Sequence, residues 1–165
     1  MRRYIAILVA LMVFVLFVSA CGGNSANAPT APEIQPIIKI TDITDKSEAD
    51  VTKALGDPIS KTDGTWRYSG TSKQVANSPT ITYKNGIEIK FIEGKAARIT
   101  ITPQTSTDIK PKDAVKLVGL NPVKPTSEAS VKTEWKNIDG IYEFSVFTQN
   151  GKIDYMYTIV KELYK

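Results

Sequence analysis

The sequence predicts an α+β fold: an antiparallel sheet with two short helices, placed behind a signal peptide and a flexible linker. Three observations lead to this prediction. Two segments with helical start and stop signals lie 63 residues apart. The stretches after each of them alternate between apolar and polar residues and are separated by glycine-containing turns. The amino-terminal segment instead has a basic start, an apolar run and then small residues, which is typical of a secretory signal.

The amino-terminal segment is too short for a stable membrane span. Arg2 and Arg3 are followed by an uncharged stretch from Tyr4 to Val18. These roughly 15 residues fall short of the ~20 that a transmembrane helix needs at ~1.5 Å per residue. The two arginines favour the cytoplasmic side, so the chain after them is exported. We therefore expect residues 1–20 to be a signal peptide.

The end of this segment, Val18-Ser19-Ala20-Cys21, resembles the lipobox of bacterial lipoproteins, with valine where leucine is usual. The resemblance implies that a diacylglycerol is attached to the sulfur of Cys21 and that the chain is cut before this residue. Each buried acyl methylene would contribute roughly 0.8 kcal/mol to membrane binding. The expected location is the extracytoplasmic side of the cell membrane, with membrane lipid as a partner through Cys21. Two alternatives are an ordinary thiol after a plain signal peptide and an uncleaved anchor.

Residues 21–36 are rich in Gly, Asn, Ala, Pro and Ser, which predicts a flexible linker. Residues 37–165 are long enough for one sheet-rich domain. The chain has 21 Lys and Arg, two of them in the signal, so 19 face 17 Asp and Glu in the exported part. Positive residues are dispersed, which argues against nucleic acid as a partner. The single cysteine excludes an internal disulfide bond.

Both helices are predicted from capping signals. Ser47, followed three residues later by Asp50, begins the first helix, and Gly56 ends it. Pro111 suits the first turn of the second helix, which ends at Gly119. The apolar residues of each helix share one face: Val51, Ala54 and Leu55 in the first, and Ala114, Leu117 and Val118 in the second.

The strands are predicted from alternation and turns. The Lys84-Asn85-Gly86 turn indicates a hairpin that leads into a strand with Ile87, Ile89 and Phe91 on one face. Further strands are expected within 65–68, 81–83, 97–101, 131–136, 141–147 and 153–159. In the last of these, Tyr155 and Tyr157 share one strand face with Ile153 and Ile159, so they are expected in the core.

The two halves of the domain resemble each other. "YKNGIEIKFIEGK" corresponds to "WKNIDGIYEFSVFTQNGK", and each helix is followed by Gly and, shortly after, Pro. We therefore predict a tandem helix-plus-strands repeat, about 45–103 and 108–165. The alternative is that part of the match reflects the common use of Asn-Gly turns in antiparallel sheets.

This layout is similar to the beta-lactamase inhibitory protein-like fold. The block formed by "LGDP" (55–58) and "GTWRY" (64–68) also resembles small outer-membrane assembly lipoproteins. The first resemblance implies one curved antiparallel sheet built from two helix-plus-four-strand repeats.

The composition limits the chemistry available. The chain has no histidine and, once lipidated, no free thiol, which excludes Cys–His and Ser–His–Asp catalysis and the usual zinc sites. Asp42, Asp45, Glu48 and Asp50 cluster at the first helix, but without the spacing of a calcium loop. We expect no enzyme activity, no cofactor and no metal. A carboxylate pair for glycoside hydrolysis is the distant alternative.

Two short helices cannot cover both faces of the sheet, and an uncovered face is suited to binding through aromatic and Arg side chains. The candidate partner-binding residues are Trp66, Arg67, Tyr68, Arg98 and Trp135. We expect a non-catalytic lipoprotein that binds a protein or another cell-envelope component through this face. One alternative, suggested by the fold resemblance, is an inhibitor or regulator of an extracytoplasmic enzyme. The other is a small-ligand or glycan-binding protein, which needs an enclosed pocket.

Overall fold

The computed structural model describes residues 33–105 and 109–165, and residues 34–165 form one compact unit. The expected signal peptide (1–20), Cys21 and most of the expected linker (21–36) lie outside the described residues. Among the helices that are described, none has the length and apolar character needed to cross a membrane.

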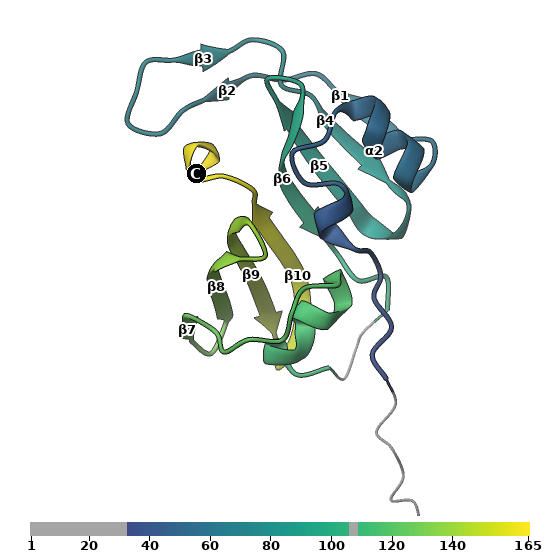
Figure 1. Cartoon of the computed structure of the whole chain (residues 1–165), viewed down its shortest axis with the longest axis vertical. Helices are drawn as coiled ribbons and strands as arrows, with labels where there is room; N and C mark the ends of the chain where they lie inside the picture. Colours follow the sequence, from purple (N-terminus) through teal and green to yellow (C-terminus); the bar gives the residue numbers. More distant parts are fainter. Residues whose placement is uncertain (1–32, 106–108) are drawn as a thin grey trace, which may run out of the picture. The chain divides into compact units, whose positions relative to one another are not determined.

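The centre of this unit is an eight-stranded antiparallel sheet with the strand order β1-β4-β5-β6-β10-β9-β8-β7 (Figure 1). Its strands are β1 (Ser60–Thr62), β4 (Thr80–Tyr83), β5 (Ile87–Ile92), β6 (Lys95–Ile101), β7 (Ser127–Glu128), β8 (Lys132–Ile138), β9 (Ile141–Gln149) and β10 (Lys152–Ile159). A separate hairpin pairs β2 (Trp66–Arg67) with β3 (Gln74–Val75). Together with two helices of eight residues each, this confirms the predicted α+β class.

The first helix follows its sequence signals closely. It is α2 (Glu48–Leu55), and it ends at Gly56. The Ser47 hydroxyl accepts a hydrogen bond from the backbone N–H of Asp50 at 3.2 Å. This bond satisfies one of the free donors at the start of a helix, which is why a Ser followed by an acid predicts the start so well.

The second helix is a 3₁₀ helix, η3 (Pro111–Val118), rather than an α-helix. Its buried residues repeat every three positions, as a 3₁₀ helix requires: Ala114 and Leu117, Val115 and Val118. The helix ends at Gly119, whose φ of 67° is left-handed. Three further short 3₁₀ turns are η1 (Ile40–Asp42), η2 (Lys84–Gly86) and η4 (Glu162–Tyr164).

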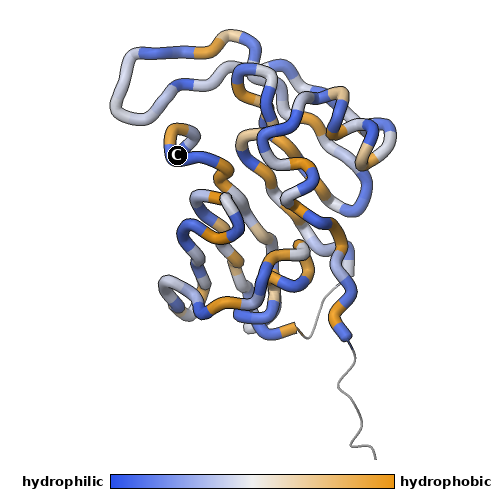
Figure 2. Tube along the Cα trace, viewed as in Figure 1, coloured by the Kyte–Doolittle hydropathy of each residue, from blue (hydrophilic) through white to orange (hydrophobic). Residues whose placement is uncertain are grey.

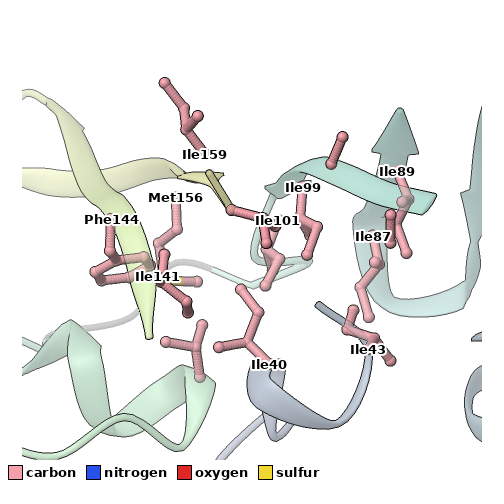
Figure 3. Packing of buried hydrophobic residues seen from close by; sticks show 14 of the residues in the cluster. Ile40, Ile43, Ile87, Ile89, Ile99, Ile101, Ile141, Phe144, Met156 and Ile159 are labelled. Atoms are coloured by element: carbon pink, nitrogen blue, oxygen red, sulfur yellow. The ribbon is translucent and has the colours of Figure 1, made fainter. Parts of the chain in front are cut away.

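One face of the sheet, which we call the helix face, packs against α2, η1 and η3. Its residues come from alternate strand positions, as the alternating hydropathy along the strands in Figure 2 shows. A single row across the sheet contains Ile81, Ile89, Ile99, Thr158, Phe144 and Trp135. Ile40 of η1 and Ile43, the residue that follows η1, pack against β5 and β6 (Figure 3). The predicted buried faces of β5 and β6 are confirmed.

The opposite face, which we call the polar face, is made by the remaining strand positions. It comprises Thr80, Thr82, Glu88, Lys90, Arg98, Thr100, Lys132, Glu134, Lys136, Glu143, Ser145, Phe147, Tyr155, Tyr157 and Ile159. Neither helix covers this face. The β2–β3 hairpin reaches part of it through Trp66.

The prediction that Tyr155 and Tyr157 lie in the core beside Ile153 was wrong. The pairing of β10 with β9 shifts register between Ile153 and Tyr155. Such a bulge adds one residue to a strand and moves every later side chain to the other face. Met156 therefore faces the core and Tyr157 the polar face. Ile159 lies on the opposite side of β10 from Met156 (Figure 3).

Candidate functional site

The β2–β3 hairpin places one aromatic side chain on the polar face. Trp66 is paired with Val75 across the hairpin and is partly buried against the body of the domain. The next residue, Arg67, alternates to the other side of the strand and is exposed. The short alternation seen in the sequence therefore separates these two side chains.

Arg98 lies on β6, near the middle of the sheet, and contacts two aromatic rings. Its guanidinium carbon is 4.7 Å from the ring centre of Trp66 and 4.9 Å from that of Tyr157. Cation–π attraction of this kind strengthens when the groups are shielded from water. Burial raises the pKa of Tyr157, and the positive charge of Arg98 opposes that rise. The two rings hold the guanidinium in place.

These three side chains line a cavity of about 340 Å³, which we call the Arg98 pocket. Its walls are Trp66, Thr80, Glu88, Lys90, Arg98, Thr100 and Tyr157. A volume of this size lies at the lower end of the range for ligand sites. The pocket lies on the polar face, between the hairpin and strands β4, β5, β6 and β10.

The two cations of the Arg98 pocket make no ion pair within the described part of the chain, although Glu88 lines the same pocket. Lys90 stands directly opposite Arg98 in the β5–β6 pairing. Among the described residues, neither Lys90 nor Arg98 forms an ion pair. The Lys90 ammonium passes close to Gly64, because a β-carbon built there would lie 2.8 Å from its Nζ. Only glycine leaves room for this lysine without a shift of its side chain.

Two hydrogen-bond donors of the pocket residues are also without partners. Trp66 Nε1 and Arg98 Nε are both buried and make no hydrogen bond within the described part of the chain. A buried donor without a partner costs about 1–3 kcal/mol. Together with the unpaired charges, these donors make the pocket suited to an acceptor with negative charge.

The other half of the polar face has the opposite character. Glu143 is only 7% exposed and receives hydrogen bonds from Lys132, Lys136 and Ser145. Burial acts to raise the pKa of Glu143, but these three donors outweigh it and lower the pKa to about 2. Lys132 and Lys136 also pair with Glu134. In this half of the polar face, each lysine is therefore paired with a carboxylate of the chain itself.

The structure brings together two of the predicted binding residues, Trp66 and Arg98. Arg67 is exposed outside the pocket. Tyr68 is 7% exposed and lines a second cavity of about 480 Å³ with Lys73, Glu93 and others. Burial raises the pKa of its hydroxyl, and the neighbouring Glu93 adds to that effect.

The prediction that Trp135 contacts a partner needs correction. Trp135 is 1% exposed, on the helix face, and its ring lies 5.5 Å from that of Phe144. Its Nε1–H donates to the carbonyl oxygen of Val123 at 2.9 Å. A large aromatic residue at an inward strand position is usually core, and here its one polar atom is satisfied inside the protein.

Sequence reasoning missed five residues of the Arg98 pocket: Thr80, Glu88, Lys90, Thr100 and Tyr157. Glu88 and Lys90 were recognisable as the polar side of their strand, and cross-strand pairing with Arg98 was the missing information. Tyr157 was assigned to the opposite face because the bulge in β10 leaves no sign in the alternation.

Three of the four acidic residues around the first helix pair with lysines. Asp42 lies near Lys39, Asp45 near Lys161, and Glu48 near Lys61. Asp50 accepts a hydrogen bond from the Ser47 hydroxyl, which lowers the pKa of this carboxyl. Within the described ranges, no group of three or more metal-ligating side chains is found.

Comparison of the chain with protein families, with curated proteins and with solved structures finds no match. The geometry of the polar face is therefore the basis on which a function can be inferred.

Proposed function

We propose that this chain is an extracytoplasmic lipoprotein, anchored to the membrane through Cys21, that binds a protein partner through its polar face. The observation that carries the proposal is the Arg98 pocket, in which Trp66 and Tyr157 hold an arginine that has no acidic partner in the described chain. Aromatic and Arg side chains of this kind are the usual anchors of protein interfaces.

The proposed role is binding rather than catalysis. Glu88 is the one carboxylate among the residues that line the Arg98 pocket. Glycoside hydrolysis uses two carboxylates on either side of the bond, so the pocket as described does not supply that pair. Its cations and aromatic rings suit recognition.

The strand order supports the proposed tandem repeat. Each half contributes four strands to the eight-stranded sheet, and their order runs outward in mirror fashion from the central pair β6 and β10. A helix precedes the strands in both halves, α2 in the first and η3 in the second. We propose that the domain is a two-repeat sheet of the kind that the resemblance to the beta-lactamase inhibitory protein-like fold implies.

A second candidate is binding of a small ligand or glycan. The observation that favours it is the Arg98 pocket itself, a cavity of about 340 Å³ with two aromatic side chains and convergent polar groups. This candidate predicts binding of a soluble compound by the purified protein without any protein partner.

Chemical crosslinking in intact cells, followed by pull-down, tests the proposed function. The samples are the wild type, Arg98→Gln, Arg67→Gln, Cys21→Ala, and Lys53→Gln as a charge-matched control on exposed α2. We expect one partner that is captured with wild type and with Lys53→Gln and is lost with Arg98→Gln. Arg67→Gln shows whether this exposed residue belongs to the interface.

The outcome against the proposal is capture that does not differ between Arg98→Gln and wild type. Each variant is first shown to be folded by its thermal unfolding curve. Cys21→Ala tests the anchor separately, because loss of lipidation should release the protein from the membrane fraction. Retention of the full-length variant in that fraction would point to an uncleaved anchor.

A further inference from the structure

We infer that the Arg98 pocket receives a carboxylate group from an acidic peptide segment of the partner. This inference rests on the proposed function and names the chemistry that the site recognises. Three features of the described pocket support it: an unrelieved pair of like charges, buried donors without acceptors, and a size and composition that favour a carboxylate.

The first feature is the cross-strand pair of Lys90 and Arg98. Directly opposed residues in an antiparallel pair have their β-carbons about 4.5–5.5 Å apart, and like charges there destabilise the sheet. Thr80 and Thr100 beside them are neutral, and Glu88, two positions before Lys90 on the same strand, forms no ion pair with either cation among the described residues. A carboxylate placed between the two cations would turn this repulsion into two charge-assisted hydrogen bonds.

The same sheet shows the alternative arrangement in its other half. Lys136 stands directly opposite Glu143, and the two form an ion pair. There the chain supplies its own carboxylate to two lysines. At the Arg98 pocket Ile159 of β10 stands opposite Arg98, where an acidic residue could have filled the same role. The missing charge is therefore one that a partner can supply.

The second feature is the pair of buried donors. Trp66 Nε1 and Arg98 Nε have no acceptor among the described residues. The cation–π contacts do not satisfy these two N–H groups, because a π face attracts the positive charge without replacing a hydrogen-bond acceptor. An incoming carboxylate offers two oxygens with about four acceptor positions, enough for both N–H groups and the Lys90 ammonium.

The third feature is selectivity. Glu88 lines the same pocket, and its negative charge disfavours a phosphate dianion more than a carboxylate with a single charge. A glycan would need a free aromatic face on which to stack. Arg98 occupies one ring face of Trp66 and one of Tyr157, which reduces the aromatic surface left for stacking. A side-chain carboxylate on a peptide fits these constraints best.

Nuclear magnetic resonance of the purified full chain in detergent, with pentaglutamate as the probe, tests the inference. We expect the Trp66 indole N–H and the Arg98 Nε–H resonances to shift on titration. The Trp135 indole is a built-in control, because its N–H already donates to Val123 in the core. Its resonance should stay in place.

Arg98→Gln should weaken pentaglutamate binding roughly tenfold or more, the effect of losing a charged hydrogen bond. Lys53→Gln should bind as wild type does. Should Arg98→Gln move the Trp135 resonance and so prove misfolded, Lys90→Gln is the second variant, and it too should weaken binding. Pentaglutamine, equal in length and uncharged, should not bind.

Other outcomes would overturn the inference. Equal binding of inorganic phosphate would remove the preference for a carboxylate. Stronger binding of tetragalacturonate than of pentaglutamate would show a glycan source. No shift with any probe, while Arg98→Gln still loses the crosslinked partner, would reject the carboxylate and leave the proposed function standing. Shifts with pentaglutamate but no crosslinked partner in cells would support the carboxylate site and reject the proposed binding of a protein partner.

Discussion

At the scale of single residues, two lysines on the polar face differ in the charge of the residue across from them. Lys90 stands across from Arg98, and Lys136 stands across from Glu143. Each lies on a strand next to its partner and each is partly buried. The sign of the neighbouring charge is the main difference, so this pair isolates the cost of the unrelieved cations.

We predict that Lys90→Gln raises the free energy of unfolding by about 0.5 kcal/mol, because it removes a like-charge contact. Lys136→Gln should lower it by about 1–2 kcal/mol, because it leaves the buried Glu143 short of a cation. Urea unfolding at low salt measures both. A loss of stability in Lys90→Gln would show that this lysine is satisfied in the free protein.

At the scale of elements, local signals predicted more than pairing did. The Ser47 cap, the Gly56 stop and the Asn85-Gly86 turn are each fixed by a few adjacent residues, and the structure confirms all three. The bulge in β10 depends on how that strand meets β6 and β9, which no local pattern records. The 3₁₀ form of η3 depends on a packing surface with a period of three.

The β4–β5 turn shows how strongly one residue can determine an element. Gly86 has a φ of 69°, and a β-carbon there would lie 2.1 Å from the carbonyl oxygen of Thr102. Gly94, in the β5–β6 turn, has a similar φ of 73° but open space around it. A side chain would be strained at both positions by the positive φ, but only at Gly86 would it also clash with a neighbouring atom.

Gly86→Ala should therefore destabilise the protein by roughly 2–4 kcal/mol, from a strained φ and a steric clash together. Gly94→Ala should cost about 1 kcal/mol, from the strained φ alone. Thermal unfolding of both variants gives the comparison. Equal losses would mean that the β4–β5 turn can move away from Thr102.

At the scale of the whole molecule, the polar face divides into a half that satisfies its own charges and a half that does not. The sequence showed the polar character of both, since Arg98 and Glu143 alternate with buried residues in their strands. It could not show the division, because that depends on which strands are neighbours across the centre of the sheet. The β2–β3 hairpin adds Trp66, which lies about 30 residues before Arg98 in the chain. The candidate site is thus a product of topology.

The half of the polar face in which Glu143 pairs with lysines makes the domain sensitive to acid. The pKa of Glu143 is lowered from 4.5 to about 2 in the folded protein. A lowered folded pKa adds stability above the unfolded value, and this contribution is lost as the pH falls from about 4.5 toward 2. The pKa values of Asp50 and Glu93 are also lowered, by the hydrogen bonds from Ser47 and Lys73, and they act in the same direction.

We therefore predict that the free energy of unfolding, measured by urea between pH 6 and pH 3, falls by on the order of 1–3 kcal/mol, because this range includes the upper part of the Glu143 window. Glu143→Gln should be less stable at pH 6 and should lose much of this pH dependence, because the group that titrates is gone. Glu128→Gln, at an exposed edge strand, is the matched control and should keep the wild-type slope. A Glu143→Gln slope equal to that of wild type would mean that other carboxylates set the acid sensitivity, and that the two lysines do not hold Glu143 ionised.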